Sequence, residues 1–511
     1  MKELKNFMEQ QAVYGTADTV NAENFAAWRQ TVKAALDQLA MTGTLGNSFY
    51  ASSKELAADA LIMLDQAEAG DLAQAIVKGR NEGFIRAVPI LGLVVLSQKD
   101  PALFKQVFDQ VILTGNDLAD FIDLAHKKRG FGRAVKSAIR SFLEKRVSPY
   151  YAMKYRKQFA DAIRLCRFRG EDPIYSYILS VYPETKGFSE DKLAAAYEKY
   201  ADLAKRKEFI ELLDAGRKSE AAALLTDSDI DVDSLTAYYD QFDREIWQAA
   251  AKRTPVMKFL KYLAKFQREG VELAALAKEK ITVSNLQRAK VFPFRLVTAE
   301  LALHGAEQEA FGSVREILLG VLDDYTDSYD WSDFNRHRWV IAPDVSGSMG
   351  SHIGRSPVLT FAHLAAMFTA FFRRGLDRVE ILPWDTDVYS FDVPKNDSVR
   401  TQMDAMLKMV GGGTYMEASV EHMIKHRIMT DYAVFITDTE EYGRGWLQSW
   451  KRYRQLNPNA KAFLLRGDSY LTSPISEDDA EKYGIKQIFG WNDSVMDYIH
   501  YCIKEKEDKH D

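Results

Sequence analysis

The sequence has little cysteine and no long apolar run. Only two of its 511 residues are cysteines, Cys166 and Cys502. Because they fall in segments that we assign to different domains, they exclude a disulfide framework and favour a reducing, cytoplasmic location. The N-terminal segment lacks the apolar core of a signal peptide. The most apolar stretch, residues 87–97, is far shorter than the roughly 20 residues that span a bilayer, so we expect a buried helix there.

Sequence motifs of the common enzyme classes are also missing. There is no Gly-x-Ser-x-Gly, no Walker loop and no plausibly spaced Cys–His pair. Of nine histidines, only His422 and His426 form a His-x-x-x-His pair that could hold zinc on one helix face. The zinc-protease pattern needs glutamate after the first histidine, and Met423 stands there. We interpret the pair as surface residues and predict that the protein is not an enzyme.

Residues 1–335 contain almost only helical patterns. Asn24–Leu39 has apolar residues at helical spacing, and Asp100-Pro101 is a typical helix start, with aspartate as N-cap and proline in the first turn. Many short helices joined by short loops are typical of stacked helical hairpins. The pattern predicts an α-solenoid of HEAT-like helical repeats.

Residues 336–511 alternate strands with helices. The strands are short, mostly apolar runs, which is typical of a parallel sheet covered on both faces. We place them at residues 339–343, 378–384, 432–437, 460–465 and 485–489. The sequence therefore predicts a multidomain chain, with a helical-repeat domain over residues 1–335 and a doubly wound α/β domain over residues 336–511.

Five oxygen-bearing side chains fall where one metal site of this α/β domain would need them. Asp344-Val-Ser346-Gly-Ser348 follows the first strand, Thr414 follows a glycine run, and Asp438 ends the strand at residues 432–437. Ligands of such sheets bind at the carboxyl ends of the strands. Carboxylate and hydroxyl oxygens suit Mg²⁺ or Mn²⁺. These residues predict a magnesium or manganese site.

This set resembles the metal-ion-dependent adhesion site (MIDAS) of von Willebrand factor A (vWA) domains. The resemblance implies that Ser346, Ser348 and Thr414 are direct metal ligands, that Asp344 and Asp438 act directly or through water, and that a partner's carboxylate completes the shell. Two alternatives stay open: the Asp and Ser side chains cap a helix of another α/β fold, or the site stays empty in the cell. Asp385 and Asp387 end another strand, and we favour turn roles for them.

Positive charge is concentrated in one segment of an acidic chain. The net charge is −6, yet residues 126–170 contain 14 Lys or Arg and only two acidic residues. Such a stripe indicates a site for a polyanion, and aromatic residues interleaved with it can stack unpaired bases. We predict that RNA contacts Arg133, Lys136, Arg140, Lys154, Arg156, Lys157, Arg164 and Arg167. In the alternative, these are the solvated faces of ordinary solenoid helices, with the aromatic residues in the core.

The same region resembles the TROVE module of Ro proteins. Residues 128–139 look like its Gly-Arg-Ala helix and Met153-Lys-Tyr-Arg156 like its Lys-Tyr helix. Residues 43–50, 254–263 and 290–295 are similar to further TROVE segments, in family order. A vWA domain after these motifs is typical of the Ro family rather than of telomerase or vault proteins. The chain is identified as a divergent, bacterial Ro-like protein.

The resemblance implies a cytoplasmic ribonucleoprotein that acts in RNA quality control. In the family the repeats close into a ring, single-stranded ends of misfolded RNA enter its hole, and small noncoding Y RNA binds outside. One departure is that two family histidines are absent from residues 159–167, which puts standard Y-RNA recognition in doubt. The alternative function is a metal-dependent protein–protein scaffold of solenoid and vWA domain, without RNA.

Overall fold

The structure is a computed structural model of the chain. It describes residues 19–20, 26–29, 32, 36, 39, 53–81, 85–289, 291, 293–303, 312–353, 358–438, 445–466, 472–489 and 495–507. The chain divides into two compact units: Met1–Val88 with Phe292–Leu301 and Leu318–Asp511, and Pro89–Val291 with Ala302–Ile317. The predicted boundary at residues 335/336 marks the change from helices to alternating strands and helices. As a domain boundary it stays a prediction.

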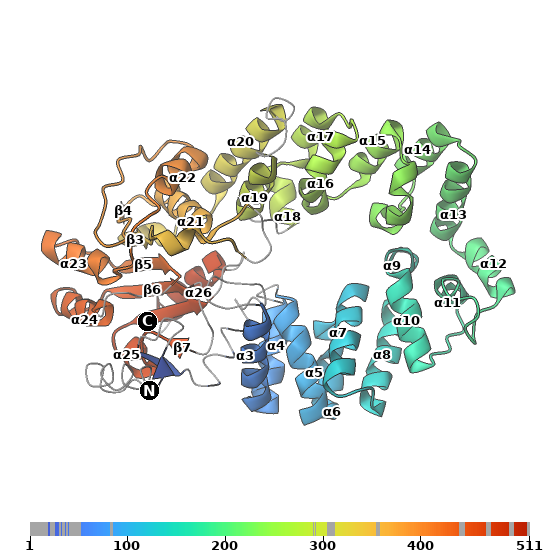
Figure 1. Cartoon of the computed structure of the whole chain (residues 1–511), viewed down its shortest axis with the longest axis horizontal. Coiled ribbons are helices and arrows are strands. Elements are labelled where there is room, and N and C mark those ends of the chain that lie inside the picture. The colour runs from blue at the N-terminus through green and yellow to red at the C-terminus, as the bar shows by residue number, and fades with distance from the viewer. Residues whose placement is uncertain are drawn as a thin grey trace. The chain divides into compact units, whose positions relative to one another are not determined.

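The second unit is built from short helices that pack mainly on their neighbours along the chain (Figure 1). They are α5 (Ala87–Lys99), α6 (Pro101–Val111), α7 (Gly115–Lys128), α8 (Arg133–Arg146), α9 (Pro149–Lys154), α10 (Arg156–Cys166), α11 (Ile174–Leu179), α12 (Glu190–Lys199), α13 (Ala201–Asp214), α14 (Lys218–Thr226), the 3₁₀ helix η1 (Val232–Gln241), α15 (Arg244–Arg253), α16 (Val256–Arg268), α17 (Leu273–Lys280) and α18 (Val283–Arg288). Neighbour-on-neighbour packing defines a solenoid, so this prediction is confirmed. Ring closure stays a prediction.

Local sequence sets the ends of these helices. Asp100 is the N-cap of α6, and its Oδ1 accepts hydrogen bonds from the Ala102 and Leu103 backbone nitrogens at 2.9 and 3.0 Å. Pro101 occupies the first turn, where a missing N–H is harmless. The predicted start of this helix is confirmed.

The first unit contains α3 (Ser53–Gln66), α4 (Ala69–Asn81) and most of α20 (Gly312–Ser328), with the first part of α19 (Pro293–Leu303). The predicted helix at Asn24–Leu39 is wrong at Ala26–Arg29, which forms strand β2. This strand pairs antiparallel with β1 (Thr19–Val20) and with β7 (Thr472–Ser473), far along the chain. Cross-strand pairing outweighs the local helical pattern there.

The α/β part of this unit has a five-stranded parallel sheet in the order β4-β3-β5-β6-β8. The strands are β3 (Trp339–Pro343), β4 (Val379–Ile381), β5 (Tyr432–Thr437), β6 (Lys461–Arg466) and β8 (Ile485–Phe489). The connecting and flanking helices are α21 (Phe361–Gly375), α22 (Val399–Leu407), α23 (Glu417–His426), α24 (Trp446–Leu456), α25 (Glu477–Lys482) and α26 (Val495–Glu507). The predicted doubly wound sheet is confirmed.

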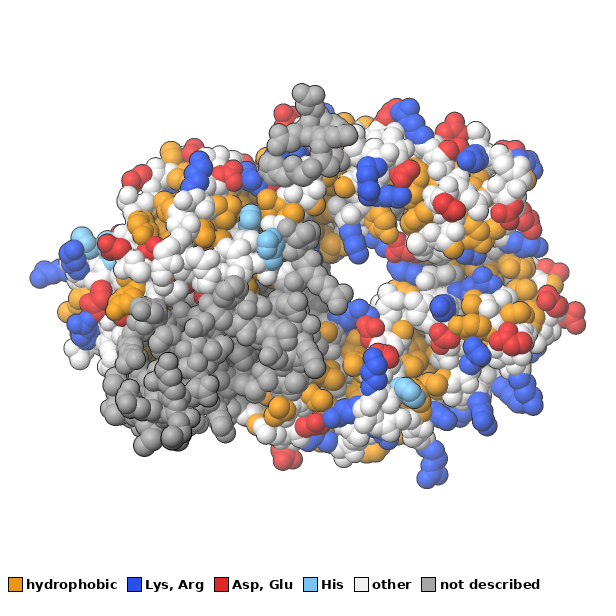
Figure 2. Space-filling view, in the orientation of Figure 1, with side chains coloured by type: hydrophobic (Ala, Val, Ile, Leu, Met, Phe, Trp, Pro, Cys, Tyr) orange, Lys and Arg blue, Asp and Glu red, His pale blue; other side chains and the backbone are white. Residues whose placement is uncertain are grey.

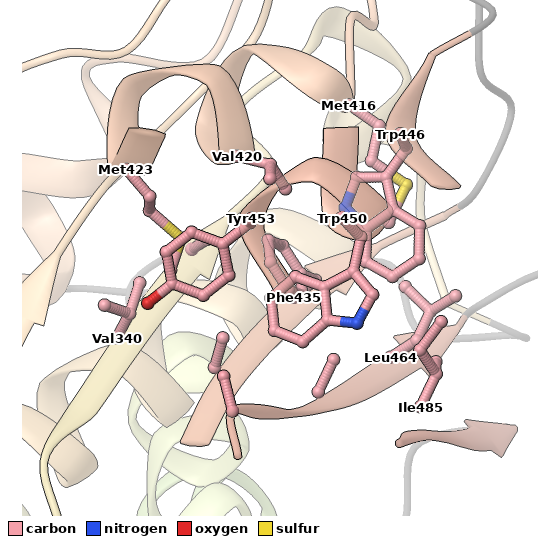
Figure 3. Close-up of a cluster of buried hydrophobic side chains, with 14 of the residues drawn as sticks. Val340, Met416, Val420, Met423, Phe435, Trp446, Trp450, Tyr453, Leu464 and Ile485 are labelled. Carbon is pink, nitrogen blue, oxygen red and sulfur yellow. The ribbon is translucent and has the colours of Figure 1, made fainter. Parts of the chain in front are cut away.

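Alternate residues of the central strands pack on opposite faces of this sheet. On one face Phe435 contacts Trp446 and Trp450 of α24, with ring centroids 5.1 and 5.9 Å apart (Figure 3). On the other face Trp339 contacts Phe372 of α21 at 5.9 Å. Because both faces are covered, β3 and β5 are buried throughout, which explains their continuous apolar sequences.

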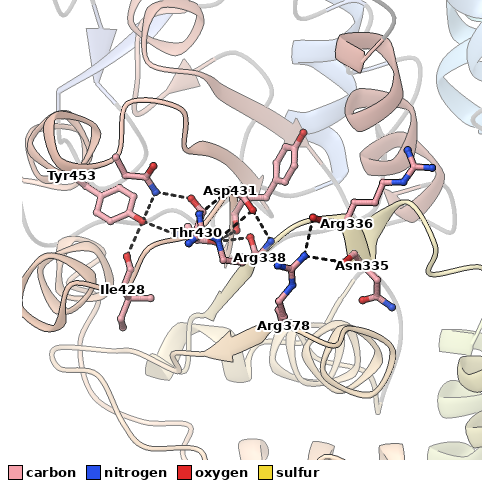
Figure 4. Close-up of polar contacts among 10 residues, drawn as sticks. Asn335, Arg336, Arg338, Arg378, Ile428, Thr430, Asp431 and Tyr453 are labelled. Carbon is pink, nitrogen blue, oxygen red and sulfur yellow. Dashed lines mark hydrogen bonds and ion pairs between the residues drawn. The ribbon is translucent and has the colours of Figure 1, made fainter. Parts of the chain in front are cut away.

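Polar contacts fix the amino ends of β3 and β5 (Figure 4). The Arg338 backbone nitrogen and guanidinium both donate to the Asp431 carboxylate, at 2.8 and 3.1 Å. The Thr430 hydroxyl donates to the Arg338 carbonyl at 2.7 Å, and the Tyr453 hydroxyl donates to the Ile428 carbonyl at 2.8 Å. These bonds set the register of the two strands, and so they determine which side chains reach the carboxyl edge.

Candidate metal centre and nucleic-acid interface

The carboxyl ends of β3 and β5 meet where the strand order of the sheet reverses. In chain order the five strands are arranged 2-1-3-4-5, so the reversal lies between the first and third strands, β3 and β5. Such a switch point is the usual ligand site of an open α/β sheet. Asp344 follows β3 and Asp438 follows β5, so both predicted carboxylates flank this point.

Hydrogen bonds hold Asp344 rigidly at this edge. Its backbone nitrogen donates to the Ile436 carbonyl at 2.8 Å. One carboxylate oxygen accepts the Ser346 backbone N–H at 2.8 Å, and the other accepts the Thr437 hydroxyl at 2.7 Å. The Ser346 and Ser348 hydroxyls lie 3.2 Å apart. The first strand and its loop therefore bring one carboxylate and two hydroxyls together.

The loop that carries Thr414 is tied to the same edge through its glycines. The Gly411 nitrogen donates to the Val345 carbonyl at 2.8 Å, and the Gly347 nitrogen donates to the Gly412 carbonyl at 3.2 Å. Gly412 has φ +72°, and an added Cβ would lie 2.1 Å from Asp385 Oδ2, so glycine is required there. We call Asp344, Ser346, Ser348, Thr414 and Asp438 the acidic sheet edge.

The acidic sheet edge carries two buried carboxylates. Asp344 and Asp438 are each 1% exposed. Burial raises the pKa of Asp344 well above its usual range, and the negative charge of Asp438 raises it further. A divalent cation would offset this repulsion, and the hydroxyls supply hard oxygen donors beside it. The residues therefore fit Mg²⁺ or Mn²⁺.

Other side chains that could bind a metal either have another structural role or lack further ligands beside them. One Asp385 oxygen accepts the Asp387 backbone N–H at 3.1 Å and the Tyr389 hydroxyl at 2.8 Å, so Asp385 stabilises its own turn. The rings of His422 and His426 stack at 4.2 Å. Within the described residues no three His, Cys, Asp or Glu side chains form a metal-binding group, so a cation at the sheet edge would depend on its hydroxyls too.

The eight predicted RNA contacts do not share one environment. Arg133, Lys136 and Arg140 recur along the outer face of α8, whose other face is buried through residues such as Ile139 and Phe142. Among the described residues none of these three cations forms an ion pair. On the face seen in Figure 2, Lys and Arg side chains gather over the part of the chain that carries α8 and α10.

The carboxyl end of α10 lies against this face of α8. Arg140 Nε donates to the Cys166 carbonyl at 3.0 Å. Burial raises the pKa of Cys166 to about 11, and the nearby charges of Arg140 and Lys136 partly oppose that rise. Arg167 follows directly and is exposed. Its φ of 50° is the left-handed conformation, which is uncommon outside glycine. We call Arg133, Lys136, Arg140 and Arg167 the α8–α10 surface.

The other predicted contacts have partners within the protein, except Lys157. Lys154 lies 3.9 Å from Asp231 and donates to the Tyr150 hydroxyl at 3.1 Å. Arg156 donates to the Tyr177 carbonyl at 3.0 Å, and burial lowers its pKa. Arg164 lies 4.3 Å from the Tyr182 ring centroid and 3.9 Å from Glu184.

Lys157 is exposed, and no ion pair to it occurs among the described residues. The aromatic residues of this stretch also divide by burial. Tyr155, Phe159 and Phe168 are buried in the core, whereas Tyr150 is 40% exposed. Sequence spacing predicts that the cations of α8 share one face, but it does not distinguish them from cations that form bonds within the protein. The segment at residues 43–50 lies outside the described residues.

The fold and the acidic sheet edge define a helical-repeat protein with a C-terminal vWA-type domain. The sequence of residues 338–501 matches the family model of the Ro60 vWA domain. The fold is similar to that of the Ro protein (RSR) of Deinococcus radiodurans, known from its crystal structure, with a TM-score of 0.64. The sequences are 16% identical over 91% of this chain and 98% of that one. No curated protein sequence matches. The chain is therefore Ro-like, in its C-terminal domain and in its fold.

Proposed function

We propose that the chain binds a structured small noncoding RNA on the α8–α10 surface and acts in RNA quality control. The observation that carries this proposal is the convergence of Lys136 and Arg140 on the end of α10, beside Arg167, with no acidic partner among the described residues. Like charges so placed repel one another, and phosphate groups relieve the repulsion while releasing counterions. The Ro-type fold supports the same function.

The acidic sheet edge supports a second part of this proposal. A Mg²⁺ or Mn²⁺ ion held there would supply a positively charged position for one more oxygen ligand. Asp344 and Asp438 would provide its negative charge, and the Ser346, Ser348 and Thr414 hydroxyls would set its geometry. We propose that a protein partner contributes a carboxylate at this position.

Purification of the chain from its host tests the RNA proposal directly. We expect RNA to co-purify, read as a raised ratio of absorbance at 260 to 280 nm, and its sequence to identify the small RNA. Gel shifts should then show binding of a hairpin RNA with a single-stranded tail that weakens as salt is added. If only protein co-purifies and the hairpin does not bind at low salt, the alternative holds: a metal-dependent scaffold that uses the acidic sheet edge.

No helix among the described residues is both long enough and apolar enough to cross a membrane.

A further inference from the structure

A pocket of about 300 Å³ lies inside the second unit, and none of the residues of the α8–α10 surface lines it. Its wall includes Tyr150 of α9, the segment Asp229–Val232 that leads into η1, and Arg253 and Lys258 around the turn between α15 and α16. Pockets of this size accept small planar ligands. Nothing in the proposed function requires a pocket there.

The lining of this pocket combines an exposed aromatic ring with charges of both signs, because Asp202, Asp229 and Asp231 lie beside Arg253 and Lys258. Tyr150 lines the pocket, and its side chain is 40% exposed. Lys154 Nζ lies 5.2 Å from the Tyr150 ring centroid. An exposed ring flanked by cations is how proteins stack a base and hold its phosphate.

One carboxylate that lines the pocket, that of Asp231, has an oxygen without a hydrogen-bond partner among the described residues. Asp231 Oδ1 accepts hydrogen bonds from Lys258 Nζ at 3.0 Å and from the Tyr150 hydroxyl at 3.4 Å. Asp231 Oδ2 is buried and has no hydrogen-bond partner among the described residues. Buried polar atoms are nearly always hydrogen-bonded in native proteins, so this oxygen indicates a missing donor.

We propose that the pocket binds a guanine base of single-stranded RNA, which rests on the proposed RNA-binding function and adds a base preference to it. Guanine presents two adjacent donors, N1–H and the N2 amine, beside the O6 acceptor. A carboxylate accepts from both donors, and O6 faces a cation such as Lys258 or Arg253. Adenine and cytosine place a ring-nitrogen acceptor beside their amine, which the carboxylate repels. Uracil offers one N–H between two carbonyls. Stacking on Tyr150 completes the site.

The test measures binding of short oligoribonucleotides to the full chain by fluorescence anisotropy. A nine-nucleotide oligouridylate with one central guanosine should bind roughly tenfold tighter than oligouridylate alone. Asp231→Asn should remove this preference, so that the two oligonucleotides bind the variant with equal affinity. Tyr150→Ala should weaken both oligonucleotides roughly tenfold, because base–aromatic stacking is lost.

Tyr389→Ala is a matched control. Tyr389 is also 40% exposed and its hydroxyl also donates to a buried aspartate, Asp385, so this variant should bind like the wild type. Inosine in place of guanosine removes the N2 amine and should reduce the preference even if Asp231→Asn fails to fold.

Equal affinity for the two oligonucleotides, or a guanosine preference that survives in Asp231→Asn, would overturn the pocket proposal. In that case binding of the structured hairpin through Arg133, Lys136 and Arg140 would still stand. If neither the hairpin nor any oligonucleotide binds, the proposed function itself fails.

Discussion

The acidic sheet edge and the α8–α10 surface concentrate opposite charges in different ways. At the sheet edge, strand pairing and backbone hydrogen bonds bury two carboxylates at one point. On α8 and α10, one helix face and a neighbouring helix end present cations to solvent. A buried site suits one small ion of high charge, whereas an exposed surface suits an extended polyanion. The stability contributed by the acidic sheet edge should therefore depend on metal and pH, whereas RNA binding at the α8–α10 surface should depend on salt.

The largest effect is expected from reversing charge on α8. Replacing Arg133, Lys136 and Arg140 together with glutamate should weaken binding of the structured RNA about 100-fold or more, because attraction to phosphates becomes repulsion. Anisotropy at fixed salt measures the loss. Glutamate at Lys192, Lys252 and Lys278, exposed on α12, α15 and α17, changes the net charge equally and is the control. An equal loss in both variants would mean that only net charge matters.

The second largest effect is expected on the stability that Mg²⁺ binding adds to the fold. With Mg²⁺ at 100 times its dissociation constant, the wild type should gain about 2.7 kcal/mol of stability. Asp344→Ala should abolish this gain, measured as the shift of the melting temperature between Mg²⁺ and EDTA. Asp387→Ala is the control, because Asp387 is an exposed turn residue beside the site. No shift in the wild type would contradict metal binding at this edge.

The stabilisation of the fold by Mg²⁺ should also depend on pH. Because the pKa of Asp344 is raised in the metal-free fold, that fold keeps a proton which the unfolded chain releases above about pH 4. Stability of the metal-free protein therefore falls as pH rises through this window, by at most about 1.4 kcal/mol per pH unit for one proton. Mg²⁺ displaces the proton, so its stabilising effect should grow from about pH 5 to 8. In Asp344→Asn the pH dependence should disappear.

The smallest effect comes from two arginines in left-handed conformation. Arg167 is the C-cap of α10 with φ 50°, and Arg427 is the C-cap of α23 with φ 53°. Glycine adopts this conformation without a Cβ clash, so Arg167→Gly and Arg427→Gly should each stabilise the fold by about 1 kcal/mol. Only Arg167→Gly should also weaken RNA binding, by about tenfold. Equal RNA affinities in the two variants would exclude Arg167 from the α8–α10 surface.

Sequence patterns predicted the regular elements well where local signals decide them. The bounds of β3 and β5 follow apolar runs directly, and Asp100-Pro101 set the start of α6. The strand at Ala26–Arg29 could not be predicted, because its partner β7 lies more than 400 residues away in the chain. Periodicity describes one helix or strand, whereas pairing depends on the whole fold.

The sites show the same limit. Asp344, Ser346 and Ser348 are adjacent in sequence, so their convergence could be predicted. Thr437 was not predicted as a partner of Asp344, although it immediately precedes Asp438. Lys154 was predicted to contact RNA, because the sequence does not show that it lies beside Asp231, which is 77 residues away in the chain. The alternating acidic and apolar residues at 229–233 were the available signal for the pocket.

The salt dependence of RNA affinity tests the central claim most directly. For a structured RNA, the logarithm of the association constant should fall linearly with the logarithm of salt concentration in the wild type. Replacing Arg133, Lys136 and Arg140 with alanine should make that slope shallower by about 2 to 3, because three phosphate contacts are lost. The same slope in the variant and the wild type would contradict RNA binding at the α8–α10 surface.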